Sequence, residues 1–160
     1  MEPAEAPVAP ASDFEGFYRD TYPSAVRLAW LLTHDGGAAE DIVQDAFGRL
    51  HARFATVERP HAYLRVAVVN GCRERRRRHA RDERRLRLVT AASDISVAPP
   101  TEPLVDALGR LPYRQRAALV LRYWADASEA DIAEAIGVRP STVRSLVARG
   151  LDALRKEIPR

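Results

Sequence analysis

The residues best suited to chemistry lie in one stretch, Ser128–Leu151, where arginine and hydroxyl side chains recur along one face of an expected helix. Val143 and Leu146 are apolar and should face inward. The outward face then carries Arg139, Ser141, Thr142, Arg144, Ser145 and Arg149. Arginine and hydroxyl groups suit base edges in the DNA major groove and backbone phosphates. The chemistry indicated is therefore recognition of DNA.

The same stretch has the pattern of a helix-turn-helix. Ser128 can cap the first helix, with Asp131 three residues later in an acidic variant of the capping box. Gly137 supplies the left-handed turn, and Pro140 suits the first turn of the second helix. Apolar or small residues fall where two crossed helices must touch, at Ile132, Ala133, Ile136, Val138, Val143 and Leu146. The alternative is an ordinary helical hairpin with a solvated arginine face, but the agreement of caps, glycine and apolar positions favours the DNA-reading motif.

A second concentration of charge is the segment Arg73–Arg87, which holds nine arginines and three acidic residues. It follows the apolar segment AYLRVAVVN closely, so one long helix is expected from His61 to about Leu88. Basic runs are often solvated tails or faces. Because this run continues an apolar helix, the favoured interpretation is a structured basic rod, that is, a helix whose arginines contact the phosphates of a nucleic-acid backbone.

The segments before this rod should form helices that support it. Order should begin at Ser12, which makes a capping box with Glu15. Pro23 should break or restart the helix, and His34–Gly37 should form a loop. The first apolar contacts should come from Phe14, Phe17, Tyr18 and Tyr22. A further helix, Ala38–Arg53, has a buried stripe made of Ile42, Val43, Ala46, Phe47 and Leu50.

The polar side of the helix Ala38–Arg53 lies away from that stripe and consists of Asp41, Gln44, Asp45, Gly48 and Arg49. An acidic first turn is also favoured by the helix dipole, so Glu40 and Asp41 have a purely structural explanation as well. The segment Phe54–Pro60 should be a loop, because proline disfavours helix in the residue before it.

The fold class expected is all-α, with two small helical domains at residues 12–88 and 104–158. Residues 1–11 are expected to be a disordered tail, and residues 89–103, which contain three prolines, a flexible linker. A short amphipathic helix after the linker should use Leu104, Val105, Leu108 and Leu111. Pro112 opens another helix, whose core-facing residues should be Ala117, Val120, Leu121 and Trp124.

Composition narrows the class of protein further. The 160 residues are 46% hydrophobic, enough for a packed core, and the net charge is +3. A single cysteine, Cys72, excludes an internal disulfide and a multi-cysteine metal site. The four histidines show no ligand spacing with Cys72 or with one another, so no metal, cofactor or catalytic residue is expected. No apolar run could span a membrane and Met1–Pro10 lacks signal-peptide features, so a cytoplasmic protein without membrane contact is expected.

Three segments together resemble the extracytoplasmic-function (ECF) sigma factors of bacterial RNA polymerase, in particular the short, arginine-rich actinobacterial subgroup. The segments are AEDIVQDAFGRL at residues 39–50, RPHAYLRVAVVNGCRERRRR at 59–78, and LPYRQRAALVLRYWADASEADIAEAIGVRPSTVRSLVARGLDALR at 111–155. The resemblance covers about Ser12–Arg155. It implies two helical domains, called region two and region four, joined by a flexible linker.

The resemblance also implies partners and roles. This chain would bind core RNA polymerase, and the clamp helices of the polymerase's largest subunit would contact Asp41, Gln44, Asp45 and Arg49. The flap of the second-largest subunit is a further expected contact. The promoter's minus-ten element would be bound by Tyr63, which replaces a common tryptophan, and by Asn70, Arg73, Arg76 and Arg77. The base pocket would lie at residues 54–62 and the helix start, with Asn70 reading a base edge unless it is simply a tolerated surface residue.

The minus-thirty-five element would meet Arg139, Ser141, Thr142, Arg144, Ser145 and Arg149. The function implied is an alternative sigma factor that binds core polymerase, recognises both elements and starts transcription by promoting DNA opening, with no chemistry of its own. Family members are often held by an anti-sigma factor, although nothing in this chain indicates one. The alternatives are a self-sufficient repressor or activator, which leaves the Asp41 face unexplained, and an enzyme acting on nucleic acid, which would need a carboxylate pair or metal cluster.

Overall fold

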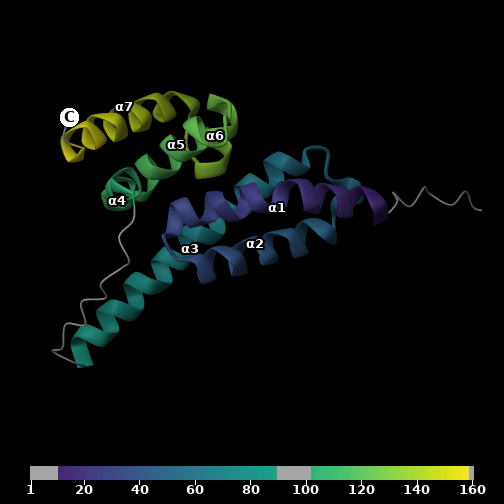
Figure 1. Ribbon diagram of the computed structural model, residues 1–160, viewed down its shortest axis with the longest axis horizontal. Helices are drawn as coiled ribbons and strands as arrows, with labels where there is room; N and C mark the ends of the chain where they lie inside the picture. Colours follow the sequence, from purple (N-terminus) through teal and green to yellow (C-terminus); the bar gives the residue numbers. More distant parts are fainter. Residues whose placement is uncertain (1–10, 90–101, 159–160) are drawn as a thin grey trace, which may run out of the picture.

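The computed structural model describes residues 11–89 and 102–158, and within these ranges the regular elements are all helices. In chain order they are α1 (Ala11–Thr33), α2 (Gly36–His51), the 3₁₀ turn η1 (Phe54–Thr56), α3 (Pro60–Val89), α4 (Pro103–Arg110), α5 (Tyr113–Tyr123), α6 (Glu129–Ile136) and α7 (Pro140–Glu157). Helices α1–α3 form the N-terminal domain and α4–α7 the C-terminal domain, which lies against one side of it (Figure 1). The all-α prediction is confirmed.

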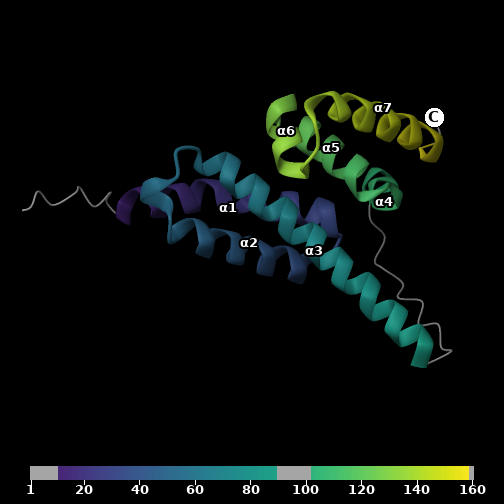
Figure 2. The same cartoon turned by 180° about the vertical axis from the view of Figure 1, so that it is seen from behind.

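The N-terminal domain is held together by the apolar stripes of three long helices. Residues with almost no exposed surface meet at its centre, among them Leu32, Val43, Leu50, Val68 and Val69. At one crossing a Cβ on Gly71 of α3 would lie 2.7 Å from Cγ2 of Ile42 in α2, so glycine allows the two helices to approach. The second half of α3 projects beyond this core (Figures 1 and 2).

The loop before α3 is fixed by aromatic packing. Phe14 and Phe17 of α1 lie with their ring centroids 5.2 and 5.5 Å from that of Phe54, in η1. Phe14 and Phe17 also contact Phe47 of α2. This cluster confirms the aromatic contacts expected of α1, and it ties the start of α3 to the other two helices.

Two boundaries differ from the sequence-based expectation. The expected break at Pro23 was wrong, because α1 is continuous from Ala11 to Thr33 with Pro23 inside it on an exposed face. Packing of both halves of α1 on the domain core outweighs the one backbone hydrogen bond that proline cannot donate. The expected loop at residues 34–37 is shorter, since α2 begins at Gly36 and the Asp35 carboxylate caps it by accepting from the Ala38 amide at 3.0 Å.

The other predicted segment boundaries lie closer to those of the structure. Helix α1 starts one residue before Ser12, whose side chain lies outside the described parts, and η1 forms a short 3₁₀ turn within the expected loop. The long helix predicted from His61 is observed as α3. Most of the expected tail and linker lies outside the described residues, although Ala11 belongs to α1, Val89 to α3 and Pro103 to α4.

The C-terminal domain contains the expected helix-turn-helix. The Ser128 hydroxyl accepts from the Asp131 amide at 3.1 Å, and Gly137 has the left-handed φ of 67°. The apolar residues at the helix crossing are buried except Val138, which is half-buried. Gly150 of α7 provides a second close approach, because an added Cβ would lie 2.8 Å from Cδ1 of Leu119 in α5.

Two residues expected in the core of this domain are exposed. Leu104, in the first turn of α4, is 49% exposed, whereas Val105, Ala107 and Leu108 are the buried residues of that helix. Trp124 is also 49% exposed, because α5 ends at Tyr123 and the tryptophan lies at the turn that follows. The Trp124 ring instead lies near the N-terminal domain, with the Arg27 guanidinium carbon 5.8 Å from its centroid.

The two domains pack closely through a buried arginine. Arg116 of α5 is only 4% exposed, and its guanidinium donates to the backbone carbonyls of Leu32, Leu108, Gly109 and Leu111. One of these acceptors belongs to α1 and the other three to the C-terminal domain. Burial lowers the pKa of Arg116 to about 10, which leaves the side chain charged at neutral pH.

Two further hydrogen bonds cross the same interface. The Tyr113 hydroxyl of α5 donates to the Val69 carbonyl of α3 at 2.7 Å. Nε2 of His34, at the end of α1, lies 2.9 Å from the Val105 carbonyl, so this nitrogen carries the hydrogen. Burial lowers the pKa of His34, which favours the neutral ring in this contact. Specific polar contacts therefore hold the two domains against each other, in addition to apolar packing. This arrangement, with the C-terminal domain packed on the N-terminal domain, is called the closed form below.

Candidate nucleic-acid interface

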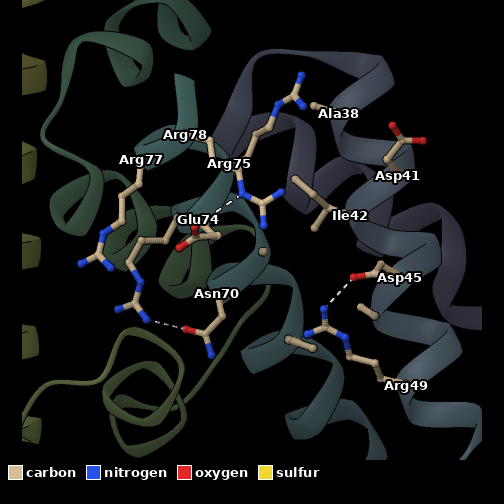
Figure 3. Close-up of a pocket in the computed structure, with 14 residues that line it drawn as sticks. Ala38, Asp41, Ile42, Asp45, Arg49, Asn70, Glu74, Arg75, Arg77 and Arg78 are labelled. Carbon is tan, nitrogen blue, oxygen red and sulfur yellow. Dashed lines mark hydrogen bonds and ion pairs between the residues drawn. The ribbon is translucent and has the colours of Figure 1, made fainter. Parts of the chain in front are cut away.

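A groove of 580 Å³ runs between α2 and α3, and residues expected to have two different roles line it (Figure 3). Asp41, Asp45 and Arg49 line it from α2. Asn70 and the arginines at 73 and 77 line it from α3. Helix packing at Ile42 and Gly71 sets the floor of the groove, so the same close approach that stabilises the domain also fixes the distance between the two sets of polar residues.

The polar face of α2 is exposed along its length, as the apolar stripe predicts. The Arg49 guanidinium donates to the Asp45 carboxylate at 2.7 Å, and both side chains are about two-thirds exposed. The Gln44 amide donates to the hydroxyls of Tyr18 and Tyr22 at 3.1 and 3.3 Å. This face therefore presents carboxylate oxygens, an amide oxygen and a guanidinium to a partner surface.

The expected minus-ten residues occupy more than one face of α3. Tyr63 and Asn70 are seven residues apart, about two helical turns, so they lie on one side of the helix. Asn70 is exposed and accepts from Arg73 through Oδ1 at 3.0 Å. Arg77 is exposed and points away from α2 (Figure 3). Arg76 lies elsewhere, because its guanidinium covers the Tyr113 ring at 5.3 Å from the centroid.

The outward face of α7 holds the expected helix-turn-helix residues. Arg139, Ser141, Arg144 and Arg149 are exposed, whereas Thr142 and Ser145 are half-buried. Nε of Arg144 lies 3.1 Å from both carboxylate oxygens of Glu129, in α6. Arg149 donates to the backbone and hydroxyl oxygens of Ser145 at 3.2 Å. Local contacts thus hold two of the four exposed residues.

Sequence reasoning missed the residues that join the two domains. Arg59 donates to the Asp131 carboxylate of α6 at 2.5 Å, and Arg65 lies 3.4 Å from the other oxygen of the same group. Arg116 was equally unassigned. No local signal separates it from Arg114 and Arg122, the other arginines of α5, and which carbonyls it meets depends on the packing of the two domains.

Comparison with known proteins identifies the two domains. Residues 17–82 match the family description "Sigma-70 region 2", and residues 101–154 match "Sigma-70, region 4". The chain is 31% identical over 152 residues to the RNA polymerase sigma-E factor of Streptomyces coelicolor, an alignment that covers 91% of this chain and 86% of the relative. The ECF RNA polymerase sigma factor SigM of Mycobacterium tuberculosis is 34% identical over 148 residues, which cover 89% of this chain and 76% of the relative. The chain belongs to the ECF sigma factors.

Solved structures show the same fold. The sigma factor RpoE of Bartonella quintana, solved in complex with the anti-sigma factor NepR, has a TM-score of 0.77 and 23% identity. The likeness covers 92% of this sigma factor and 97% of that chain. The family relationship establishes promoter recognition and transcription initiation with core RNA polymerase as the function. Within the described residues no helix is long and apolar enough to cross a membrane.

Proposed function

We propose that this sigma factor docks on the clamp helices of the polymerase's largest subunit through Asp41, Gln44, Asp45 and Arg49. The observation that carries the proposal is the exposed polar face of α2, which stands directly beside the groove lined by Asn70. Carboxylates on a rigid helix can accept paired hydrogen bonds from arginines of a partner. The flap of the second-largest subunit is the proposed contact of the C-terminal domain.

The minus-ten element is the proposed ligand of α3. An unstacked base would enter beside Tyr63, and Asn70 would read its edge through donor and acceptor groups of one amide. Arg73 and Arg77 would hold phosphates on either side of that base without specifying sequence. Arg76, which is exposed although its guanidinium covers the Tyr113 ring, would be a third phosphate contact.

The minus-thirty-five element is the proposed ligand of α7, through Arg139, Ser141, Thr142, Arg144, Ser145 and Arg149. Exposed arginines at the start and middle of the second helix of this motif are suited to the major groove. Residues 12–88 and 104–158 would act as two separate units, each weak alone. Polymerase would fix their separation and so raise the effective concentration of the second contact.

We also infer that the polymerase makes the phosphodiester bonds while this chain, acting in the cytoplasm, supplies only recognition and DNA opening. A regulator of the anti-sigma class is a further proposed partner, by analogy with the complex of the Bartonella quintana protein. The test of the whole proposal is run-off transcription by core polymerase with this chain on a pool of randomised promoters. Enrichment of templates that share two spaced elements is expected, and an unenriched pool would refute it.

A further inference from the structure

The contact between α6 and the start of α3 has the form of an occupied anion site. The Asp131 carboxylate of α6 lies between two guanidinium groups, with Arg59 at 2.5 Å and Arg65 at 3.4 Å. A second acidic residue of α6, Glu134, lies 3.9 Å from the other terminal nitrogen of Arg59. Two arginines from the N-terminal domain therefore converge on one oxyanion supplied by the C-terminal domain.

Asp131 does not satisfy all the donors that face it. Nε of Arg65 is buried and, in the part of the chain that the structure describes, has no hydrogen-bond partner. Arg65 reaches the carboxylate only through one terminal nitrogen, at the long distance of 3.4 Å. A guanidinium prefers two parallel bonds to an oxyanion, and a phosphate group offers more acceptor directions than a carboxylate.

The two arginines lie on either side of the start of α3, next to the proposed base pocket. Arg59 ends the loop that precedes α3, where the base pocket is proposed, and Arg65 lies two residues beyond Tyr63. Helix α6 packs against α3 and, in both views, lies close to the first half of that helix (Figures 1 and 2). With the two domains packed together, α6 therefore lies beside the proposed base pocket.

We propose that Arg59 and Arg65 form a binding site for a backbone phosphate of the promoter strand, and that Asp131 occupies this site in the closed protein. Closure of the domains and binding of the minus-ten strand then exclude each other. The inference rests on the proposed minus-ten role of α3. It adds two phosphate contacts to that role and assigns an inhibitory function to α6.

The electrostatics of the contact agree with this assignment. Hydrogen bonds from Arg59 and Ser128 lower the pKa of Asp131, so the group is an anion at physiological pH, as a phosphate is. The contact is only partly exposed, because the Arg59 side chain is 63% exposed while those of Asp131 and Arg65 are 17% and 24% exposed. Arg116 and Tyr113 make further hydrogen bonds between the domains. An opening step that replaces Asp131 by a phosphate would preserve the charge balance at both arginines.

The test measures binding of the full chain to a fluorescein-labelled, 15-nucleotide single-stranded DNA pool of random sequence by fluorescence anisotropy. Asp131→Asn should bind about fivefold more tightly than the unaltered chain, because it removes the competing anion. Asp152→Asn is the matched control. It removes the same charge from the C-terminal domain, but its partner is Arg155 on the same helix, so affinity should stay near that of the unaltered chain.

A second arm adds Arg59→Ala to Asp131→Asn. This double variant should lose the gain, and the slope of log affinity against log salt should fall by about 0.7, the value for one lost phosphate contact on a single strand. Arg65→Ala combined with Asp131→Asn should give the same two results, the lost gain in affinity and the smaller salt slope. If Asp131→Asn alters the helical circular dichroism spectrum, Asp131→Ser replaces it.

Two outcomes would overturn the proposal. One is a variant at Asp131 that binds DNA no more tightly than Asp152→Asn, and the other is a double variant that keeps the full affinity and salt slope of Asp131→Asn. Co-elution of each variant with core polymerase is measured in parallel. Lost polymerase binding by these variants, with the expected DNA results, would contradict docking confined to the α2 face and leave the phosphate site standing. Normal polymerase binding with unchanged DNA affinity would refute the phosphate site alone.

Discussion

In the N-terminal domain the proposed binding residues stand on two long helices whose positions follow from extensive packing, whereas in the C-terminal domain they stand on a helix placed by a short turn at Gly137. Asp45 and Asn70 face one groove because α2 and α3 approach closely at Gly71. Arg144 is placed by local features, the cap at Ser128 and the turn. The positions of the proposed binding residues thus depend on contacts between helices in the N-terminal domain, and on local backbone geometry in the C-terminal domain.

The domains also differ in how their charges are partnered. The projecting half of α3 is strongly basic, whereas α6 presents Glu129, Asp131 and Glu134, which pair with arginines of both domains. This acidic helix therefore contacts basic residues from each of the two proposed DNA-binding faces. Under the proposed competition for Arg59 and Arg65, the C-terminal domain restrains the N-terminal domain while the protein is free.

The largest effect is expected at the polymerase-facing side of the N-terminal domain. Reversing charge with Asp41→Arg and Asp45→Arg should weaken binding to core polymerase by about 100-fold or more, because carboxylate acceptors become repelling cations. Co-elution and a titration of transcription measure this. Asp13→Arg with Asp20→Arg, both exposed on α1, provides the same charge change away from α2. Equal loss in both pairs would show a net-charge effect and contradict the docking assignment.

The next effect concerns base reading by α3. Asn70→Ala should relax selectivity at one minus-ten position by about 1–3 kcal/mol, because alanine offers neither the donor nor the acceptor of the amide. Run-off transcription on promoters changed one base at a time measures it. Arg73→Ala is the matched comparison, since it should weaken all templates alike. A uniform loss in Asn70→Ala would show that this residue does not read a base.

A pair of glycine variants contrasts the two ways in which the domains are built. Gly71→Ala should destabilise the protein by about 2 kcal/mol, because its Cβ would force α2 and α3 apart at Ile42. Gly137→Ala should cost about 1 kcal/mol, because space is open there and only the left-handed backbone is unfavourable. Urea unfolding measures both. The reverse order would contradict the distinction between packing and local geometry.

The smallest effect is expected at the C-terminal recognition helix. Arg144→Ala should reduce use of the minus-thirty-five element by about 1 kcal/mol, since it removes one base or phosphate contact among several. Transcription from a promoter with both elements, compared with one that has a scrambled upstream element, measures the change. Identical activity of Arg144→Ala and the unaltered chain on the intact promoter would contradict the assignment.

Local signals made the helix-turn-helix predictable, whereas long-range contacts did not leave a readable pattern. Ser128 and Gly137 each act within a few residues, so their effect was visible in sequence. Pro23 misled because the packing that keeps α1 continuous comes from other helices. The meeting of Arg59 with Asp131 joins residues 72 positions apart and depends on how the domains close, which no local pattern specifies.

The groove beside Asn70 was partly predictable for the same reason. Helical periodicity placed Asp41, Asp45 and Arg49 on one exposed face, and the structure agrees. Periodicity within one helix does not show which other helix lies beside it, so the shared groove emerged only from the packing of α2 on α3. The position of Arg76 against Tyr113 likewise depends on domain closure.

The central claim is that two weak DNA-binding domains become a promoter reader only on the polymerase. Its most direct test mixes the purified chain with core polymerase, follows co-elution by size-exclusion chromatography, and assays run-off transcription on a promoter carrying both elements. The account predicts a stable complex that initiates on this promoter and loses activity when either element is scrambled. A chain that elutes apart from polymerase, or transcription unaffected by scrambling both elements, would contradict it.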